Sequence, residues 1–488
     1  MNPPVAAYRN ILKTTSIIGG SSAINIAIGI IKVKVLAVLL GPAGVGLLGL
    51  YLNIMGMASS LAGCGLGVSG VRQLAAASGE EATLDIVRRT LWLANLILGF
   101  TGMLFLWLLR EPVSQSIFGD IDHANNVGWL GIGVMLTLIA GSQTALLQGL
   151  RRIGDLARVN IISSVLGAIS GILLVYWLGE HGVLWFVLTA PAISILVASY
   201  YAARLPRPKS AHDWRVINQQ WQAMLKLGIP FMMTGLLGFA TQLTARTMIQ
   251  RELGLEATGY FHAAWAISMT YIGLVLSAMG ADYYPRLTAV IKNHPLVRKM
   301  VNEQAEMSLL LAGPILLCMI TFAPWVIHLL YAESFAPATE VLRWQVLGDV
   351  FKVASWPIGF ILLAQGRGVV FILAELIWSA VYLGVIFLGG QGWGLVVAGV
   401  GFWIAYLIYF GLIAMLGFRL VGFKPAKSYL LMTLLLSFAG GLIMFSAKQS
   451  TVAGYAIGLM FILSSSIYSL HKMDGLLDLR GWLKQKIK

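Results

Sequence analysis

Four basic side chains lie inside apolar stretches of this sequence, where a positive charge is costly unless something stabilises it. They are Lys32, Lys34, Arg246 and Lys352. Lys and Arg donate charge-assisted hydrogen bonds to phosphate and carboxylate oxygens. These four residues are therefore the first candidates for a site that binds an anionic group.

Lys34 and Arg246 occupy similar positions in two apolar segments. Lys34 is seven residues before Gly41, or about 10 Å along a helix, and Arg246 is six residues before Glu252. When the chain is compared with itself at a shift of 213, Lys34 falls on Thr247, next to Arg246. An anionic group held between the two cations would account for both. The alternatives are an internal ion pair for Arg246 and a Lys34 side chain that extends to the lipid headgroups.

Lys32 is expected to play a different part. It is two positions from Lys34, about 200° around a helix, so the two side chains cannot face one cavity. We predict that Lys32 extends to the headgroups.

A second candidate site combines carboxylates with a cation. Asp349 and Lys352 are three residues apart, close enough to pair on one helical face, and Trp356 adds an aromatic ring to that face. The pair could fix helix packing, or Asp349 could exchange a proton and release Lys352 to an anion. Glu375 has no local partner, and a lone carboxylate in hydrocarbon must be protonated or find a distant cation. Asp349 and Glu375 are candidates for ion coupling.

Signatures of catalysis are missing from the sequence. It contains no phosphate-binding loop, nucleophile elbow or metal-ligand spacing, and Cys64 and Cys318 both lie in apolar runs. We predict no catalytic residue, no metal site and no cofactor.

The elements that position these residues are membrane-spanning helices. Mean hydropathy is +0.81 and only 11% of residues are charged, while apolar stretches of about 20 residues, enough to cross a bilayer, repeat from end to end. We predict an all-α polytopic membrane protein with about 14 transmembrane helices. The expected spans are 14–40, 45–71, 86–109, 126–150, 158–178, 183–203, 226–249, 258–283, 304–330, 341–365, 369–388, 393–416, 428–447 and 451–471.

The distribution of basic residues predicts the topology. Of the 34 lysines and arginines, 26 fall at the termini or in every second connection, which the positive-inside rule assigns to the cytoplasm. Both termini are then cytoplasmic. This arrangement explains the net charge of +14 without nucleic acid as a partner.

The chain also repeats itself. The matches at a shift of 213 include Gly41 with Gly254 and Gly46 with Gly259, and Gln148-Gly149 matches Gln365-Gly366 at a shift of 217. Such a period predicts duplication, and an even number of spans makes the copies parallel repeats.

The expected organisation follows from the repeat. Residues 1–204 form an N-terminal six-helix lobe, 205–222 a cytoplasmic linker and 223–420 a C-terminal six-helix lobe, while 421–488 add two helices and a basic cytoplasmic tail. Substrate is expected in the cleft between the lobes.

Three stretches resemble a known group of proteins. Residues 34–46 resemble the first-span signature of bacterial lipid-linked oligosaccharide flippases of the O-antigen and enterobacterial common antigen type, and 344–375 resemble their tenth and eleventh spans. Arg246, with Gly254 and Gly259-Tyr260 after it, has the wider pattern of polysaccharide-export proteins. The resemblance covers nearly the whole chain and implies the multidrug/oligosaccharidyl-lipid/polysaccharide exporter superfamily.

The resemblance implies roles for five residues. Lys34, Arg246 and Lys352 would bind the anionic diphosphate headgroup of the substrate, and Asp349 and Glu375 would serve ion coupling. The two C-terminal helices depart from the shortest members of the group.

The function implied is translocation across the bacterial inner membrane. The substrate would be undecaprenyl-diphosphate-linked oligosaccharide, an O-antigen-type repeat unit, moved from the cytoplasmic to the periplasmic face by alternating access of a cationic cleft between the lobes. Its other partners would be membrane lipid and polysaccharide polymerase and chain-length machinery.

Three alternatives remain open or are disfavoured. A lipid II flippase of peptidoglycan synthesis would share the fold and the cations. A cation-coupled multidrug exporter of the same superfamily would need a cleft lined by carboxylates to bind cationic drugs. The four intramembrane cations of this chain disfavour that alternative. A membrane-embedded polymerase or ligase is disfavoured because the predicted outer loops are short.

Overall fold

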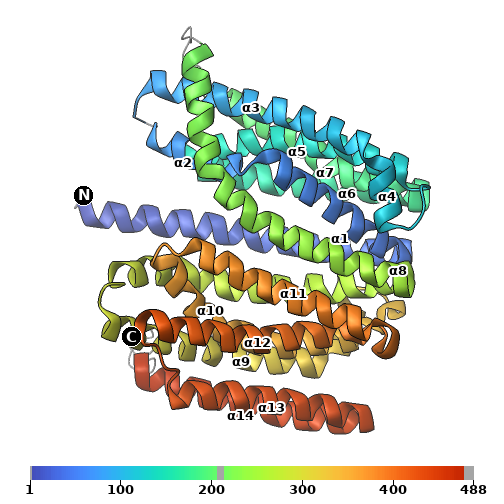
Figure 1. Cartoon of the computed structure of the whole chain (residues 1–488), viewed down its shortest axis with the longest axis vertical. Coiled ribbons are helices and arrows are strands. Elements are labelled where there is room, and N and C mark those ends of the chain that lie inside the picture. Colours follow the sequence, from blue (N-terminus) through green and yellow to red (C-terminus); the bar gives the residue numbers. More distant parts are fainter. Residues whose placement is uncertain (1–2, 78, 206–213, 478–488) are drawn as a thin grey trace. The chain divides into compact units, whose positions relative to one another are not determined.

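The computed structural model describes residues 3–77, 79–205 and 214–477, and its regular structure in this part of the chain is entirely helical (Figure 1). This confirms the predicted all-α fold. The helices are α1 (Pro3–Gly63), α2 (Leu66–Ala76), α3 (Glu81–Leu108), α4 (Arg110–Ile117), α5 (Ala124–Gly149), α6 (Ile153–Leu178), α7 (Gly182–Ala203), α8 (Trp214–Ala289), α9 (His294–Leu330), α10 (Ala338–Ala364), α11 (Gly368–Trp393), α12 (Val396–Val421), α13 (Lys427–Gln449) and α14 (Thr451–Leu477), with short 3-10 turns at Gly179–His181 and Glu333–Phe335.

Two of these helices are each broken by one glycine. Gly41 in α1 has φ 63° and ψ −172°, and Gly254 in α8 has φ 86° and ψ 177°. Side chains disfavour these positive φ angles, whereas glycine adopts them readily. Each break therefore divides a very long helix into two.

The breaks reconcile the observed helices with the predicted number of spans. Eleven segments of the described chain are long and apolar enough to cross a membrane. Two of them contain the breaks at Gly41 and Gly254, and a third, Ile153–Ala203, contains the 3-10 turn between α6 and α7. Counting each of these three as two gives 14 spans, the predicted number.

Several backbone features recur at nearly constant separations along the chain, while the two-lobe repeat itself stays a prediction. The breaks at Gly41 and Gly254 are related by the same shift of 213 as the sequence matches. Helices α6 and α11 have equal lengths, and each ends at a glycine with positive φ. These two glycines, Gly179 and Gly394, correspond at a shift of 215.

The turn before α6 and the turn before α11 also match at a shift of 215. Arg151 (φ 54°) and Gly366 (φ 71°) take the left-handed conformation there. The backbone N–H groups of the next residues, Arg152 and Arg367, each donate a hydrogen bond to the carbonyl oxygen five residues earlier in the chain. The two turns therefore correspond at a shift of 215, whereas the Gln148-Gly149 and Gln365-Gly366 pairs correspond at a shift of 217.

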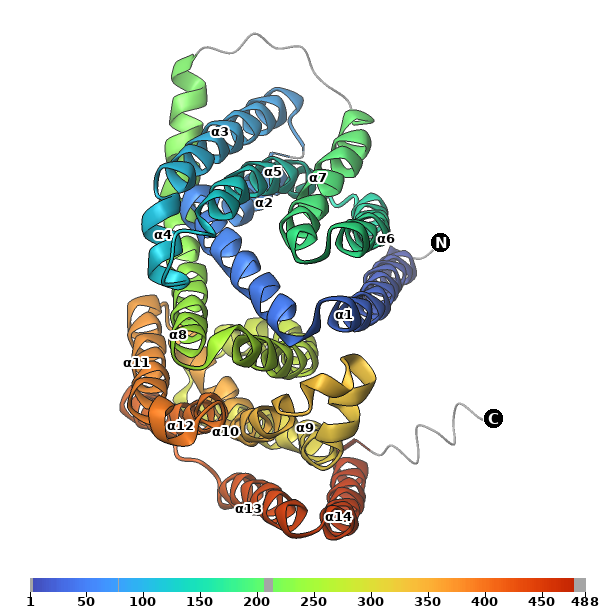
Figure 2. The ribbon, with the colours of Figure 1, turned by 90° about the vertical axis from the view of Figure 1, so that its right-hand side faces the viewer.

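The described chain forms two compact units, one up to Gly259 and the other from Tyr260 onward. The first contains α1 to α7 and the part of α8 that leads to the break (Figure 2). The seventh span thus lies with the first unit, whereas the predicted lobes divide within 205–222. The lobe and linker bounds stay a prediction, and 206–213 lie outside the described residues.

Close backbone contact at two points explains why the seventh span belongs to the first unit. A Cβ added to Gly46 would collide with the carbonyl oxygen of Leu255, and one added to Gly259 would collide with that of Pro42. Gly46 and Gly259 are one of the residue pairs matched at a shift of 213, so the contact joins positions that the predicted repeat makes equivalent.

The second contact lies near the other end of the same helix pair. A Cβ on Gly65 would collide with the carbonyl oxygen of Gly228, and one on Gly228 with that of Cys64. The part of α1 that follows Gly41 and the first part of α8 therefore run antiparallel and touch near both ends.

The second unit is built around α10. This helix packs against α9, α11, α12 and α13, and its residues are buried on almost every side. The helices α13 and α14 pack against α9, and Lys472 of α14 forms an ion pair with Glu306 of α9.

We expect Gly46→Ala to destabilise the protein because the added methyl group meets the Leu255 carbonyl oxygen rather than a flexible side chain. Overpacking of this kind costs about 1–3 kcal/mol. A thermal unfolding experiment on the purified protein should show a lower Tm. Gly238→Ala on α8, where the added Cβ meets nothing within 4 Å, is the matched control. Equal Tm values for the two variants would contradict the contact.

Candidate functional site

Arg246 is buried in the first unit, with 5% of its surface exposed. Its Nη1 donates to the carbonyl oxygen of Gly49 at 2.6 Å. The Asn53 side-chain amide is oriented so that both of its polar atoms form hydrogen bonds. The amide oxygen accepts from Arg246 Nη1 at 3.2 Å, and the amide nitrogen donates to the Phe239 carbonyl oxygen at 3.1 Å. The guanidinium is thereby oriented against α1.

The sequence of α1 explains this arrangement. Gly49 and Asn53 are four residues apart, so the carbonyl and the amide lie on one face of the helix. The backbone contact at Gly46 and Gly259 holds α8 close enough for Arg246 to reach that face.

A neighbouring polar network lies between α1 and α5. The hydroxyl of Tyr51, a fully buried side chain, accepts from Asn126 Nδ2 at 2.9 Å and is 3.2 Å from His123 Nδ1. Sequence reasoning assigned no role to this cluster, since both partners are far from Tyr51 along the chain.

The two lysines of α1 lie before its break. Lys34 is half-buried on the segment before Gly41, whereas Arg246 binds the segment after it. Their sharing of one anion stays a prediction. Lys32 is also half-buried, and its ammonium lies 5.7 Å from the ring centroid of Phe186 on α7, a cation–π contact that the sequence could not indicate.

In the second unit, Asp349 is fully buried on α10. Its Oδ2 accepts hydrogen bonds of 2.7 Å from Ser268 Oγ and the Tyr271 hydroxyl, both on α8. The predicted pairing with Lys352 is present, with Nζ 3.9 Å from Asp349 Oδ1. Buried carboxylates persist where hydrogen bonds and a cation offset their lost hydration.

Lys352 of α10 contacts side chains of both α8 and α12. Its Nζ is 3.2 Å from the Met269 sulfur and lies 5.8 Å and 5.6 Å from the ring centroids of Phe402 and Tyr406. Trp356, which the sequence places on the same face of α10, packs on Tyr283 and Phe360.

Glu375 of α11 has a partner that the sequence did not reveal. Its Oε1 accepts from the Tyr409 hydroxyl at 2.6 Å, and its carboxylate also interacts electrostatically with Lys352. Tyr409 belongs to the next helix, α12, whereas the sequence predicted a protonated carboxyl group or a distant cation. Two carboxylates and one ammonium therefore form one network contributed by α10 and α11.

Aromatic rings surround this network. Trp378 stacks on Tyr382 at 5.3 Å, and Phe402 and Tyr406 lie 4.8 Å apart, with Trp265 5.6 Å from Phe402. Such packing keeps the local dielectric low, so the charges act on one another strongly. A change in the charge of either carboxylate would change the force on Lys352.

Comparison with known proteins gives these features a context. The family described as "Polysaccharide biosynthesis protein" matches residues 35–340, more than half of the chain. The "Lipid III flippase" of Escherichia coli (strain K12) is 23% identical over 370 residues, which cover 73% of this chain and 85% of that protein. The "Succinoglycan biosynthesis transport protein ExoT" of Rhizobium meliloti (strain 1021) is 23% identical over 320 residues, 65% of this chain and 61% of that protein.

Solved structures show the same fold at low sequence identity. An inward-facing multidrug resistance MATE family transporter of the MOP superfamily has a TM-score of 0.66 at 18% identity, covering 81% of this chain and 95% of that one. The lipid II flippase MurJ in an inward closed conformation has a TM-score of 0.64 at 13% identity, covering 88% and 97%. With many membrane-spanning helices and a family match over most of its length, this chain belongs to the polysaccharide biosynthesis protein family.

Proposed function

We propose that this protein is a flippase for lipid-linked oligosaccharide. The observation that carries the proposal is the buried guanidinium of Arg246, fixed on membrane-spanning helices in a member of a polysaccharide biosynthesis family. Two relatives, named as a lipid III flippase and a succinoglycan transport protein, support the same class of cargo.

The physical task explains why cations are useful here. A diphosphate-linked sugar that crosses the bilayer unaided would expose its charges to hydrocarbon, at a very large cost. Basic groups placed along the path offset that cost by charge-assisted hydrogen bonds to phosphate oxygens. In the proposal, Lys34, Arg246 and Lys352 bind the diphosphate at successive stages of transport.

The carboxylates give this proposal an ion-coupled step. While Asp349 is ionised, it attracts Lys352 at 3.9 Å. A proton or a metal cation that neutralises Asp349 weakens this attraction, so Lys352 becomes available to the diphosphate. Glu375, held by Tyr409, acts on the same ammonium.

The finer features of the proposal come from the sequence. They are an undecaprenyl-diphosphate O-antigen-type repeat unit as cargo, movement from the cytoplasmic to the periplasmic face, alternating access of a cationic cleft between the two predicted lobes, and cytoplasmic termini. Polymerase and chain-length machinery would then receive the flipped units.

The fold alone does not separate this function from two others. Both a lipid II flippase and a MATE transporter have this architecture. The intramembrane cations favour an anionic lipid over a cationic drug.

We expect Arg246→Ala and Lys34→Ala each to lower the rate of flipping by about tenfold or more, since a hydrogen bond to a charged group contributes about 1.5–3 kcal/mol. The measurement is the movement of a fluorescent lipid-linked oligosaccharide in vesicles that contain the purified protein. Arg246→Lys keeps the charge but loses the planar donor geometry, so it should retain intermediate activity.

Lys299→Ala is the control, because Lys299 is exposed and pairs only weakly with Glu303 at 3.8 Å. Quantifying the protein in the membrane separates loss of transport from loss of folding. Unchanged flipping by both alanine variants would remove these cations from the mechanism.

Neutralising the carboxylates should weaken the dependence of transport on an ion gradient. We expect transport by Asp349→Asn and Glu375→Gln to respond less to an imposed proton or sodium gradient than transport by the unmodified protein. Because Asp349→Asn leaves a buried Lys352 without its ion pair, the double variant Asp349→Asn/Lys352→Met tests whether folding is responsible. Tyr409→Phe removes one hydrogen bond from Glu375 and should shift the ion dependence without abolishing flipping. A full gradient response in both carboxylate variants would refute the coupling role.

A further inference from the structure

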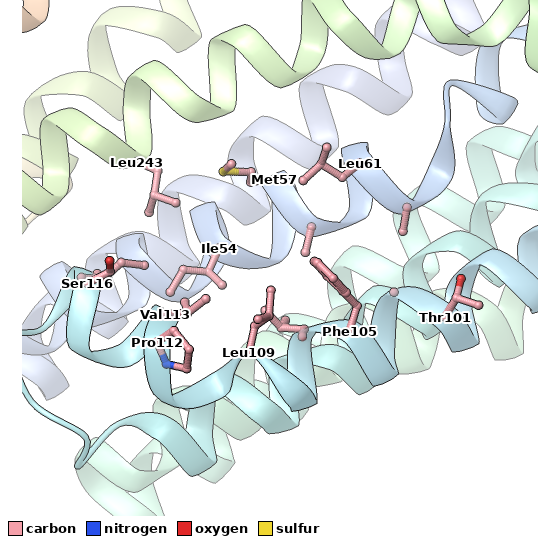
Figure 3. Close-up of a pocket in the computed structure, with 15 residues that line it drawn as sticks. Ile54, Met57, Leu61, Thr101, Phe105, Leu109, Pro112, Val113, Ser116 and Leu243 are labelled. Atoms are coloured by element: carbon pink, nitrogen blue, oxygen red, sulfur yellow. The ribbon is translucent and has the colours of Figure 1, made fainter.

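The first unit contains an apolar cavity of about 720 Å³ among α1, α3, α4 and α8 (Figure 3). Ile54, Met57 and Leu61 of α1 form one wall and Phe105 of α3 stands opposite, while Leu243 enters from α8. None of the candidate charged residues lines this cavity. It is therefore a separate feature of the unit.

The lining is suited to hydrocarbon. Only two hydroxyl side chains, Thr101 and Ser116, interrupt it, and the Thr101 hydroxyl already donates to the Leu98 carbonyl at 3.0 Å. Small side chains at Ala58 and Ala62, one turn apart on α1, leave the space open. A polar guest would lose its hydration without gaining hydrogen bonds there.

The cavity opens at the surface of the unit. Two of its lining side chains, Phe105 and Leu61, are 63% and 42% exposed. A chain lying in the surrounding bilayer could therefore enter from the side without crossing a polar layer.

Two guanidinium groups lie beyond one end of this cavity. Arg246 is one helical turn from Leu243 and is bonded to the Asn53 amide, next to Ile54. Arg251, a further turn along α8, is exposed and donates to the carbonyl oxygen of Gln115 at 2.7 Å. This cavity, which opens at the surface and is called the groove below, is thus apolar along its length and cationic beyond one end.

We propose that this groove holds the proximal part of the polyprenyl chain of the transported lipid, with its diphosphate beside Arg251 at the cationic end. The assignment rests on the proposed function and adds to it a binding place for the tail. An amphiphile with an anionic head and one hydrocarbon chain matches the order of groups along the groove.

The charge at the cationic end favours a diphosphate over a phospholipid headgroup. The exposed guanidinium of Arg251 can form bidentate bonds with phosphate oxygens, and the buried guanidinium of Arg246 adds a second positive charge on the same helix. The neighbouring segments carry the acidic residues Glu111, Asp120, Glu252 and Glu256, all of which are exposed. None of these four lines the groove.

The test is photocrosslinking of the full-length protein in phosphatidylglycerol vesicles that contain undecaprenyl diphosphate as a minor component. Benzoylphenylalanine replaces Phe105 in one variant and Phe100 in the matched control. Both rings are exposed on α3, at 63% and 53%, but only Phe105 lines the groove. We expect adducts at position 105 to be enriched in the undecaprenyl chain by about tenfold over its share of the bilayer, equivalent to about 1.4 kcal/mol. Adducts at position 100 should follow the bilayer composition.

Two further variants test the two ends separately. Ala58→Phe fills the groove and should reduce the enrichment at position 105. Arg251→Gln should reduce the enrichment of undecaprenyl diphosphate but leave that of neutral undecaprenol unchanged. If Ala58→Phe fails to fold, Leu243→Phe on α8 serves the same purpose.

The outcomes separate this assignment from the proposed function. Adducts at 105 that match bulk lipid, or that are enriched in phosphatidylglycerol, would overturn it, even if the protein flips lipid-linked oligosaccharide normally. Enrichment of the undecaprenyl chain at position 105 in a protein that flips no lipid-linked oligosaccharide would support the groove as a binding place for the chain. The same result would refute the proposed flippase function.

Discussion

The cost of placing a charge in hydrocarbon determines how this protein uses its polar residues. Three intramembrane charged groups, Arg246, Asp349 and Glu375, are fixed by hydrogen-bond partners drawn from other helices. Arg246 meets a carbonyl and an amide of α1, Asp349 meets two hydroxyl groups of α8, and Glu375 meets a hydroxyl of α12. These partners stabilise the charges and also orient them, so a group that is costly to bury becomes a group with a defined direction.

Glycine makes the first of these sites possible. The positive φ at Gly41 starts a new helix inside α1, and the contacts at Gly46 and Gly65 bring α8 against that helix. Backbones that touch bring Arg246 within reach of a main-chain carbonyl. In the second unit, large aromatic side chains surround the charge instead of closely packed backbones. The rings of Phe402 and Tyr406 pack around Lys352.

The sequence predicted the helical fold, the number of spans and the pairing of Asp349 with Lys352, because hydropathy, length and helical spacing are local properties. It did not predict the Tyr409 partner of Glu375 or the contact of Lys32 with Phe186, because both depend on how separate helices pack. The difference between the sequence match at a shift of 217 and the backbone match at a shift of 215, at the turn before α11, has a similar origin. A shared residue pair is visible in the sequence, whereas the left-handed backbone of Arg151 is not.

The contact between Gly46 and Gly259 says something about the origin of the chain. If the two halves arose by duplication, these glycines descend from one residue, and here each lies against its own counterpart. A contact between equivalent positions is what a twofold axis produces in a homodimer. Under the predicted duplication, the axis that relates the two copies would therefore pass beside this pair of glycines.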